Sequence, residues 1–265
     1  SGQMLEASVK IDITRGNASK TAISIPHFAY KSSLEGEIGR NISKVIRSNL
    51  TRTGLFSVAN VTQDIEVDVK AIPISDSWKN VHTEILITTS IQKLSNGKVE
   101  IKFRIWDVPS ARQLAGKAIV FDSKNWRRAA HIVSDVIYER LTGEEGYFDT
   151  KIIYVSETIG DSHSRRIAVM DQDGYNTTYM TDGSRFVLSP RFSPDTKKIV
   201  YTSYINRQSR IVLRDLDTSR EIILGDFSGV TSAPRFSPDG KSIAWLSMQR
   251  AGFEADKNRI MLMDL

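Results

Sequence analysis

The hexapeptide Pro-Arg-Phe-Ser-Pro-Asp occurs twice in the chain, at residues 190–195 and 234–239, 44 residues apart. The residues that follow also correspond, since Lys-Ile-Val-Tyr-Thr-Ser at 198–203 matches Ser-Ile-Ala-Trp-Leu-Ser at 242–247. A less regular copy begins with Lys-Ile-Ile-Tyr-Val-Ser at 151–156. A period of about 40–45 residues, built of short alternating strands and Pro/Asp/Gly turns, is typical of β-propeller blades. We therefore predict that the second half of the chain is all-β.

Each repeat contains a turn whose residue types suit its geometry. Pro238 presets φ, Asp239 can bond to its own backbone, and Gly240 tolerates a positive φ. Thr196 takes the place of the glycine in the earlier copy, which a type I turn would accept at little cost. The aromatic residues Phe192, Phe236, Tyr201 and Trp245 recur at the same period and are predicted to pack between neighbouring blades.

The first half of the chain predicts an α+β domain with a mixed sheet and two helices. Apolar residues at helical spacing predict one helix over 34–53, with Ser33 as N-cap and Gly54 after its end, and a second from Asn125 to Gly143. Ser95-Asn96-Gly97 is a hairpin signal. The predicted strands are 9–15, 21–29, 55–61, 65–71, 84–94, 98–107 and 114–121.

Two domains follow from these patterns: residues 1–146 form the α+β domain and residues 147–265 an incomplete all-β propeller of about two and a half blades. The joint is placed in Gly143–Asp149, where glycines and acids interrupt the periodic pattern. Because a propeller closes with about four blades or more, we expect the chain to stop inside its third blade, as a fragment of a longer protein with an unpaired edge.

Composition excludes several functions. The net charge is +5, but no basic run exceeds two residues, so we expect no nucleic-acid partner. The absence of cysteine excludes a disulfide scaffold, a thiolate zinc site and a cysteine nucleophile. No apolar run reaches the roughly 18 residues of a membrane-spanning helix, so we expect no direct membrane insertion.

No catalytic, cofactor or metal site is predicted. The chain lacks a Gly-x-Ser-x-Gly elbow, a phosphate loop, a His-Glu-x-x-His helix and a dinucleotide-binding glycine motif. The four histidines, at 27, 82, 131 and 163, share no metal-ligand spacing and are interpreted as packed or surface residues. Asp171-Gln-Asp-Gly174 begins like a calcium loop but lacks the other ligands, and is interpreted as a turn at the end of a blade strand.

Several stretches resemble the TolB family, the periplasmic components of the bacterial Tol-Pal system. They are Glu37-Ile-Gly39 with the helix ending in Thr53-Gly-Leu-Phe56, Trp126-Arg-Arg-Ala-Ala-His131 running to Gly143, and Phe148-Asp-Thr-Lys-Ile-Ile-Tyr-Val155. The resemblance covers essentially the whole chain. It implies an α/β domain joined to a six-bladed propeller, no enzymatic activity, a periplasmic location, and a monomer when full length. It also implies a role in outer-membrane integrity and cell division.

The resemblance further implies two partners. The inner-membrane-anchored TolA would bind the N-terminal strand, consisting of Val9, Lys10, Ile11, Asp12, Ile13, Thr14, Arg15 and Gly16. An alternating strand near a terminus can detach and add to the edge of a partner's sheet. The lipoprotein Pal would bind propeller loops made of Ser228, Gly229, Val230, Thr231, Ser232, Ala233, Val187 and Arg191. Val230 stands where the family has a histidine that contacts the partner.

Two other functions fit the repeats. Related propellers are attached to prolyl-oligopeptidase-type hydrolases, so this one could gate a hydrolase domain lying beyond residue 265. The chain could also be a cytosolic scaffold. A Gly-x-Ser-x-Gly segment downstream would favour the hydrolase, whereas further blades and then a stop would favour a Tol-Pal component. A leader upstream of Leu5 would exclude the cytosolic scaffold.

Overall fold

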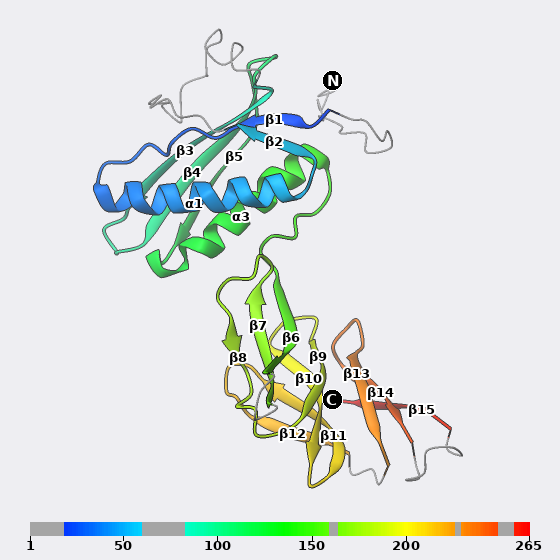
Figure 1. Ribbon diagram of the computed structural model, residues 1–265. Coiled ribbons are helices and arrows are strands. Elements are labelled where there is room, and N and C mark those ends of the chain that lie inside the picture. The colour runs from blue at the N-terminus through cyan, green and yellow to red at the C-terminus, as the bar shows by residue number, and fades with distance from the viewer. Residues whose placement is uncertain (1–18, 60–82, 159–163, 226–228, 249–256) are drawn as a thin grey trace, which may run out of the picture. The chain divides into compact units, whose positions relative to one another are not determined.

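The computed structural model describes residues 19–59, 83–158, 164–225, 229–248 and 257–265. The chain divides into two compact units, Ser1–Asp149 and Thr150–Leu265 (Figure 1). The strands predicted at 9–15 and 65–71 lie outside the described residues, as do His82 and His163.

The described residues of unit 1 form a mixed five-stranded sheet with two helices. Its strand order is β2-β1-β3-β4-β5, with β1 parallel to both β2 and β3, and with β3, β4 and β5 forming an antiparallel meander. The strands are β1 (Thr21–Ser24), β2 (Phe56–Ala59), β3 (Ile85–Lys93), β4 (Val99–Asp107) and β5 (Arg112–Phe121). The helices α1 (Ser33–Arg52) and α3 (Trp126–Thr142) lie on the same face of the sheet (Figure 1), and a short 3-10 turn, η1 (Ser123–Asn125), precedes α3.

The core of unit 1 fills the space between the sheet and the two helices. Alternate residues of the central strands, among them Ile87 and Phe103, pack with Ile46 of α1 and Val133 of α3. This arrangement agrees with the period of 2 in the strands and of about 3.6 in the helices. The mixed sheet with two helices, predicted from the sequence, is confirmed.

The hairpin and the end of α3 are also where the sequence placed them. The Gly97 N–H donates to the carbonyl of Leu94 at 3.0 Å, and Gly97 has a φ of 80°. Gly143 follows α3 with a φ of 79° and donates to the carbonyl of Glu139 at 2.8 Å. Both glycines occupy the left-handed region, where a side chain would be strained.

Two details of the prediction are corrected. The N-cap of α1 is Ser32 rather than Ser33, because the Ser32 hydroxyl accepts from the Glu35 N–H while the Glu35 carboxylate accepts from the Ser32 N–H. The strand predicted over 21–29 ends at Ser24 and makes only an isolated bridge at Ala29. Pro26 accounts for the interruption, since it has no N–H to donate to a neighbouring strand.

In the part of unit 2 that the structure describes, three antiparallel sheets follow one another along the chain, as propeller blades do. The first sheet contains β6 (Lys151–Thr158), β7 (Ser164–Asp171) and β8 (Thr178–Tyr179). The second contains β9 (Val187–Phe192), β10 (Lys198–Ile205), β11 (Gln208–Asp215) and β12 (Glu221–Leu224). The third contains β13 (Thr231–Phe236), β14 (Ser242–Ser247) and β15 (Arg259–Asp264).

Neighbouring sheets of unit 2 are joined by separate hydrophobic clusters. Tyr201 packs with Ile167 of the first sheet. The adjacent residue, Val200, points to the opposite face of the strand and packs with Trp245 of the third sheet. Tyr201 and Trp245 are buried, and Phe192 and Phe236 pack at the edges of these clusters. The predicted packing of the periodic aromatic residues between blades is confirmed.

The two repeat turns share one backbone conformation. Thr196 has a φ of 58° and Gly240 a φ of 72°, and the N–H of each donates to the serine carbonyl three residues earlier. The expectation that Thr196 fits at little cost is therefore wrong. A β-branched residue in the left-handed region is strained by about 1–2 kcal/mol.

Candidate partner-binding strands

The predicted Pal-binding residues lie mainly in strands rather than in loops. Residues 231–233 begin β13 and residues 187–191 belong to β9, so the loop assignment is corrected. The backbone explains the difference, because Thr231 pairs with Ser247 of β14 and Val187 with Ser203 of β10. Gly229 and Val230 immediately precede β13. Ser228 and the predicted TolA-binding residues 9–16 lie outside the described part of the chain.

Burial divides the predicted residues into two groups. Val230 and Arg191 are exposed and can reach a partner directly. Val187 and Thr231 are buried, and the Thr231 N–H and hydroxyl donate to the hydroxyl and the carbonyl of Ser209 at 2.7 and 3.0 Å. These two bonds attach the start of β13 to β11 of the preceding sheet. Thr231 therefore positions the start of this strand.

A β-bulge occurs at the same place in β9 and β13. Ser189 and Ala233 have φ values of 52° and 54°, and the pairing register shifts beside each of them. A bulge rotates the following residues relative to the sheet, so it re-aims their side chains. The residue aimed in this way is the arginine of the repeated hexapeptide, which is Arg191 in β9 and Arg235 in β13.

Arg191 and Arg235 have equivalent surroundings. Each is exposed, and Nη1 of each donates to the carbonyl of the preceding proline, at 2.7 Å for Arg191 and 2.8 Å for Arg235. The pKa of Arg235 is lowered, first by partial desolvation of its guanidinium and second by the positive charge of Arg191. Within the described residues neither arginine pairs with a carboxylate. The two form a cationic pair that is suited to an acidic group.

Arg235 was missed as a site residue in the sequence. Its signal was available, because Arg235 occupies the same position of the hexapeptide as Arg191. The repeat could therefore have indicated both arginines, whereas the bulges that aim them have no comparable local signature.

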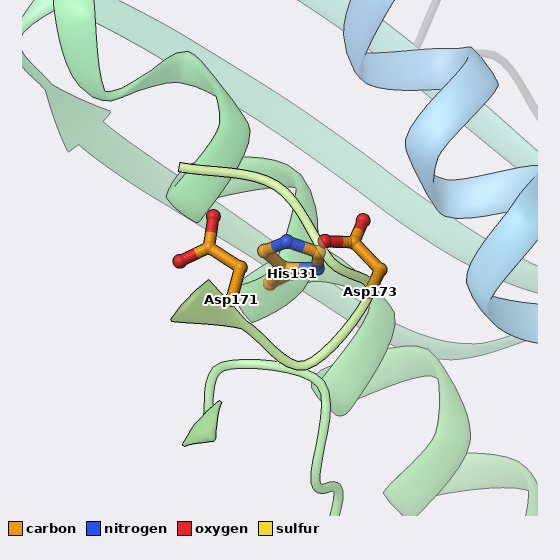
Figure 2. A group of neighbouring side chains, drawn as sticks. All are labelled: His131, Asp171 and Asp173. Carbon is orange, nitrogen blue, oxygen red and sulfur yellow. The ribbon is translucent and has the colours of Figure 1, made fainter. Parts of the chain in front are cut away.

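Figure 2 shows three further residues, which the sequence analysis did not predict to be metal ligands: His131 on α3 of unit 1, and, in unit 2, Asp171 at the end of β7 and Asp173 just after it. In unit 1, His131 is buried and its Nδ1 lies 3.0 Å from Nδ2 of Asn49. In unit 2, the Asp171 carboxylate accepts from Lys151 at 3.1 Å and from Asn176 at 2.6 Å. The Gly174 N–H donates to the Asp171 carbonyl, which confirms the predicted turn.

Comparison with known families gives one match for each unit. Residues 9–114 match the TolB amino-terminal domain, and residues 138–265 match the TolB beta propeller domain. Together with the sheets described above, these matches define a protein in which an α/β domain precedes a β-propeller domain. The chain belongs to the TolB family.

Individual relatives agree with this assignment. The chain is 46% identical over 200 residues to the Tol-Pal system protein TolB of Anaplasma marginale, covering 75% of this chain and 45% of the relative. It is 40% identical over 210 residues to the Tol-Pal system protein TolB of Paramagnetospirillum magneticum, covering 78% of this chain and 47% of the relative. The chain thus spans about half the length of the curated relatives it matches.

A solved structure shares the fold. The crystal structure of TolB from Acinetobacter baumannii superposes with a TM-score of 0.79 at 26% sequence identity, covering 93% of this chain and 58% of that chain. Neither helix in the described part of the chain has the length and hydrophobicity of a membrane-spanning segment.

Proposed function

We propose that the chain is a non-enzymatic, periplasmic component of the Tol-Pal system, which binds Pal through its propeller strands and TolA through residues 9–16. The observation that carries this proposal is the order of the two family matches, an amino-terminal TolB domain followed by a TolB propeller. Relatives that are 46% and 40% identical carry the name Tol-Pal system protein TolB. In this role the protein supports outer-membrane integrity and cell division.

The propeller part of the proposal is supported by the exposed residues of β9 and β13. Arg191 of β9 and Arg235 of β13 are exposed, as is Val230 just before β13, and the bulges at Ser189 and Ala233 orient the arginines. Two guanidinium groups without a carboxylate partner among the described residues can accept an acidic side chain of Pal. Buried Val187 and Thr231 hold these strands in place.

Calorimetric titration with Pal and with the TolA C-terminal domain tests both contacts. Arg191→Gln and Arg235→Gln are each expected to weaken Pal binding by about tenfold, because each removes one charge-assisted contact. Lys241→Gln changes the net charge equally on an exposed turn and is the matched control. Unchanged Pal affinity in both arginine variants would show that these propeller strands do not contribute to the Pal interface.

Removal of residues up to Arg15 tests the second contact. TolA binding is expected to be lost while Pal binding is retained, because the deletion leaves unit 2 intact. If both ligands bias one conformational equilibrium, Pal must change the affinity for TolA and TolA must change that for Pal by the same factor. Equal TolA affinity with and without Pal would exclude such coupling.

A further inference from the structure

A groove lies between the first and second sheets of unit 2, and its lining includes neither Arg191 nor Arg235. Its volume is about 530 Å³, within the range of small-molecule sites. One wall comes from β7, β8 and the segment after β8, and carries Arg166, Tyr179 and Asp182. The other wall comes from β10, β11 and β12 of the second sheet. Both walls belong to unit 2, so the groove is formed within one compact unit.

A carboxylate is already bound by side chains in this groove. Glu221 Oε1 accepts from the Tyr201 hydroxyl at 2.7 Å and from Arg214 Nη1 at 2.8 Å, and Oε2 accepts from Arg185 Nη1 at 3.3 Å. The second acid, Asp182, accepts from the N–H and the hydroxyl of Ser184 at 2.9 and 2.6 Å. Both acidic residues of the groove therefore have their own partners.

The groups left over in the groove are donors. The hydroxyl of Ser203, a residue only 1% exposed, and Nε of Arg214 have no hydrogen-bond partner among the residues that the structure describes. The Arg166 guanidinium lies 3.8 Å from the centroid of the Tyr179 ring, and its described surroundings include no ion pair. Buried donors are normally satisfied by protein or by a bound molecule, so these groups call for an acceptor.

Charge indicates what kind of acceptor fits. Three arginines line the groove, Arg166, Arg185 and Arg214, against the two carboxylates of Glu221 and Asp182, which leaves one positive charge. A single negative charge would balance it. Planar guanidinium groups pair well with carboxylates, and the bonds to Glu221 show that the geometry of this cluster suits one. Tyr179 and Met180 add apolar surface beside the charged groups.

We propose that this groove is a binding site for a small organic monocarboxylate. Its carboxylate would lie between Arg166 and the donors Ser203 and Arg214, and its apolar part against Tyr179 and Met180. The groove shares Val187 with the predicted Pal-binding residues, but this side chain is buried. Arg191, Arg235 and Val230, through which Pal binding is proposed, do not line the groove, so the proposal does not depend on the binding of Pal or TolA.

Titration of the full 265-residue chain with N-acetylglycine, followed by NMR, tests the proposal. A ligand of about eight non-hydrogen atoms is expected to bind with a millimolar dissociation constant. We expect saturable shifts at the groove residues with N-acetylglycine and none with the neutral N-acetylglycinamide. Absence of saturable shifts, or equal shifts with the amide, would overturn the proposal. Binding of inorganic phosphate without N-acetylglycine would overturn the carboxylate assignment.

Two variants separate binding from folding. Arg166→Gln is expected to weaken the binding of N-acetylglycine about tenfold. Lys241→Gln, which removes the same charge outside the groove, is expected to change this affinity less than about twofold. Ser203→Ala removes an unsatisfied buried hydroxyl, so the free protein is expected to be as stable or more stable while binding weakens. A Ser203→Ala protein that is destabilised but binds normally would show that the hydroxyl has only a structural role.

Discussion

The Tyr201 hydroxyl donates to Oε1 of Glu221 at 2.7 Å and thereby connects β10 to the outermost strand of its sheet, β12, across β11. Tyr201 is 1% exposed, so the donor of this bond is buried. Tyr201→Phe keeps the ring and removes one donor to a charged acceptor. We expect unit 2 to lose about 1–2 kcal/mol of stability, measured by urea denaturation.

The same bond predicts a pH dependence. Burial raises the pKa of Tyr201, and the hydrogen bond and the negative charge of Glu221 raise it further. Since the folded protein holds this proton more tightly than the unfolded chain, the stabilisation is complete below the ordinary tyrosine pKa of about 10 and is lost as the pH rises above it. The stability difference between wild type and Tyr201→Phe should therefore shrink above about pH 10. A constant difference would contradict the role of the proton.

Glu35 provides the corresponding test in unit 1. Its carboxylate accepts from the N–H groups of Lys93 at 2.7 Å, and of Lys31 and Ser32 at 2.9 Å each. The glutamine of Glu35→Gln has only one acceptor oxygen and cannot satisfy all three donors, so we expect the protein to lose about 1–3 kcal/mol of stability at neutral pH. Glu37→Gln, exposed in the same turn of α1, is the control and should change stability by less than about 0.5 kcal/mol.

The pH profile of Glu35→Gln has the opposite sign to that of Tyr201→Phe. The pKa of Glu35 is lowered, chiefly by the Lys93 N–H, although desolvation opposes the shift. The folded state therefore favours the carboxylate, and its stabilisation is present above the ordinary glutamate pKa of about 4.3 and is lost as the pH falls through the lowered value. Denaturation of wild type and variant between about pH 2 and 7 measures this convergence. If the stabilities of wild type and variant differed by the same amount at every pH, the charge of Glu35 would not be responsible for the difference.

The turns and helix ends of unit 1 show which parts of the structure the sequence could predict. The hairpin at residues 95–97 and the end of α3 at Gly143 depend on neighbouring residues, and the sequence placed both correctly. The predicted N-cap of α1 is one residue away from the observed one, because Ser32 and Ser33 have the same residue type and therefore equal capping ability in isolation. Ser32 is the cap because it exchanges hydrogen bonds with Glu35. The Glu35 carboxylate also accepts from the N–H of Lys93, 58 residues away, a contact that the local sequence does not indicate.

The binding residues were less predictable than the fold. Arg191 and Arg235 are marked by a repeated motif, but the bulges at Ser189 and Ala233 that orient them arise from strand pairing. The groove has no local motif at all, because its lining comes from several strands and the segment between two sheets. Residues in a repeated motif can therefore be recognised in the sequence, whereas a site formed by residues from several strands cannot.

Gly146 tests the close packing of the segment that follows α3. A Cβ atom on Gly146 would lie 2.5 Å from Cα of Asp135, whose carboxylate accepts from the N–H groups of Phe148 and Asp149 at 2.6 and 3.0 Å. Because the obstacle includes main chain, Gly146→Ala must displace this segment, and we expect a loss of about 1–3 kcal/mol. Glu145→Ala, at an exposed neighbouring position, is the control. Equal stability of the two variants in urea would show that the segment yields freely.

The two repeat turns form a matched pair for the last prediction. Thr196 and Gly240 occupy equivalent positions with φ values of 58° and 72°, so one turn bears a strained β-branched residue and the other does not. Thr196→Gly should stabilise unit 2 by about 0.5–1 kcal/mol, since relief of strain exceeds the entropic cost of glycine.

The reciprocal change, Gly240→Ala, should destabilise unit 2 by about 1 kcal/mol through backbone strain. An added Cβ would meet Pro194, with Cδ at 3.4 Å and Cγ at 3.7 Å, which are ordinary contacts, so steric overlap does not contribute. Hydrogen exchange of peptides from each turn, measured with denaturant melts of both variants, would localise the effects. Changes of the same sign in the two variants would show that φ does not control the stability of these turns.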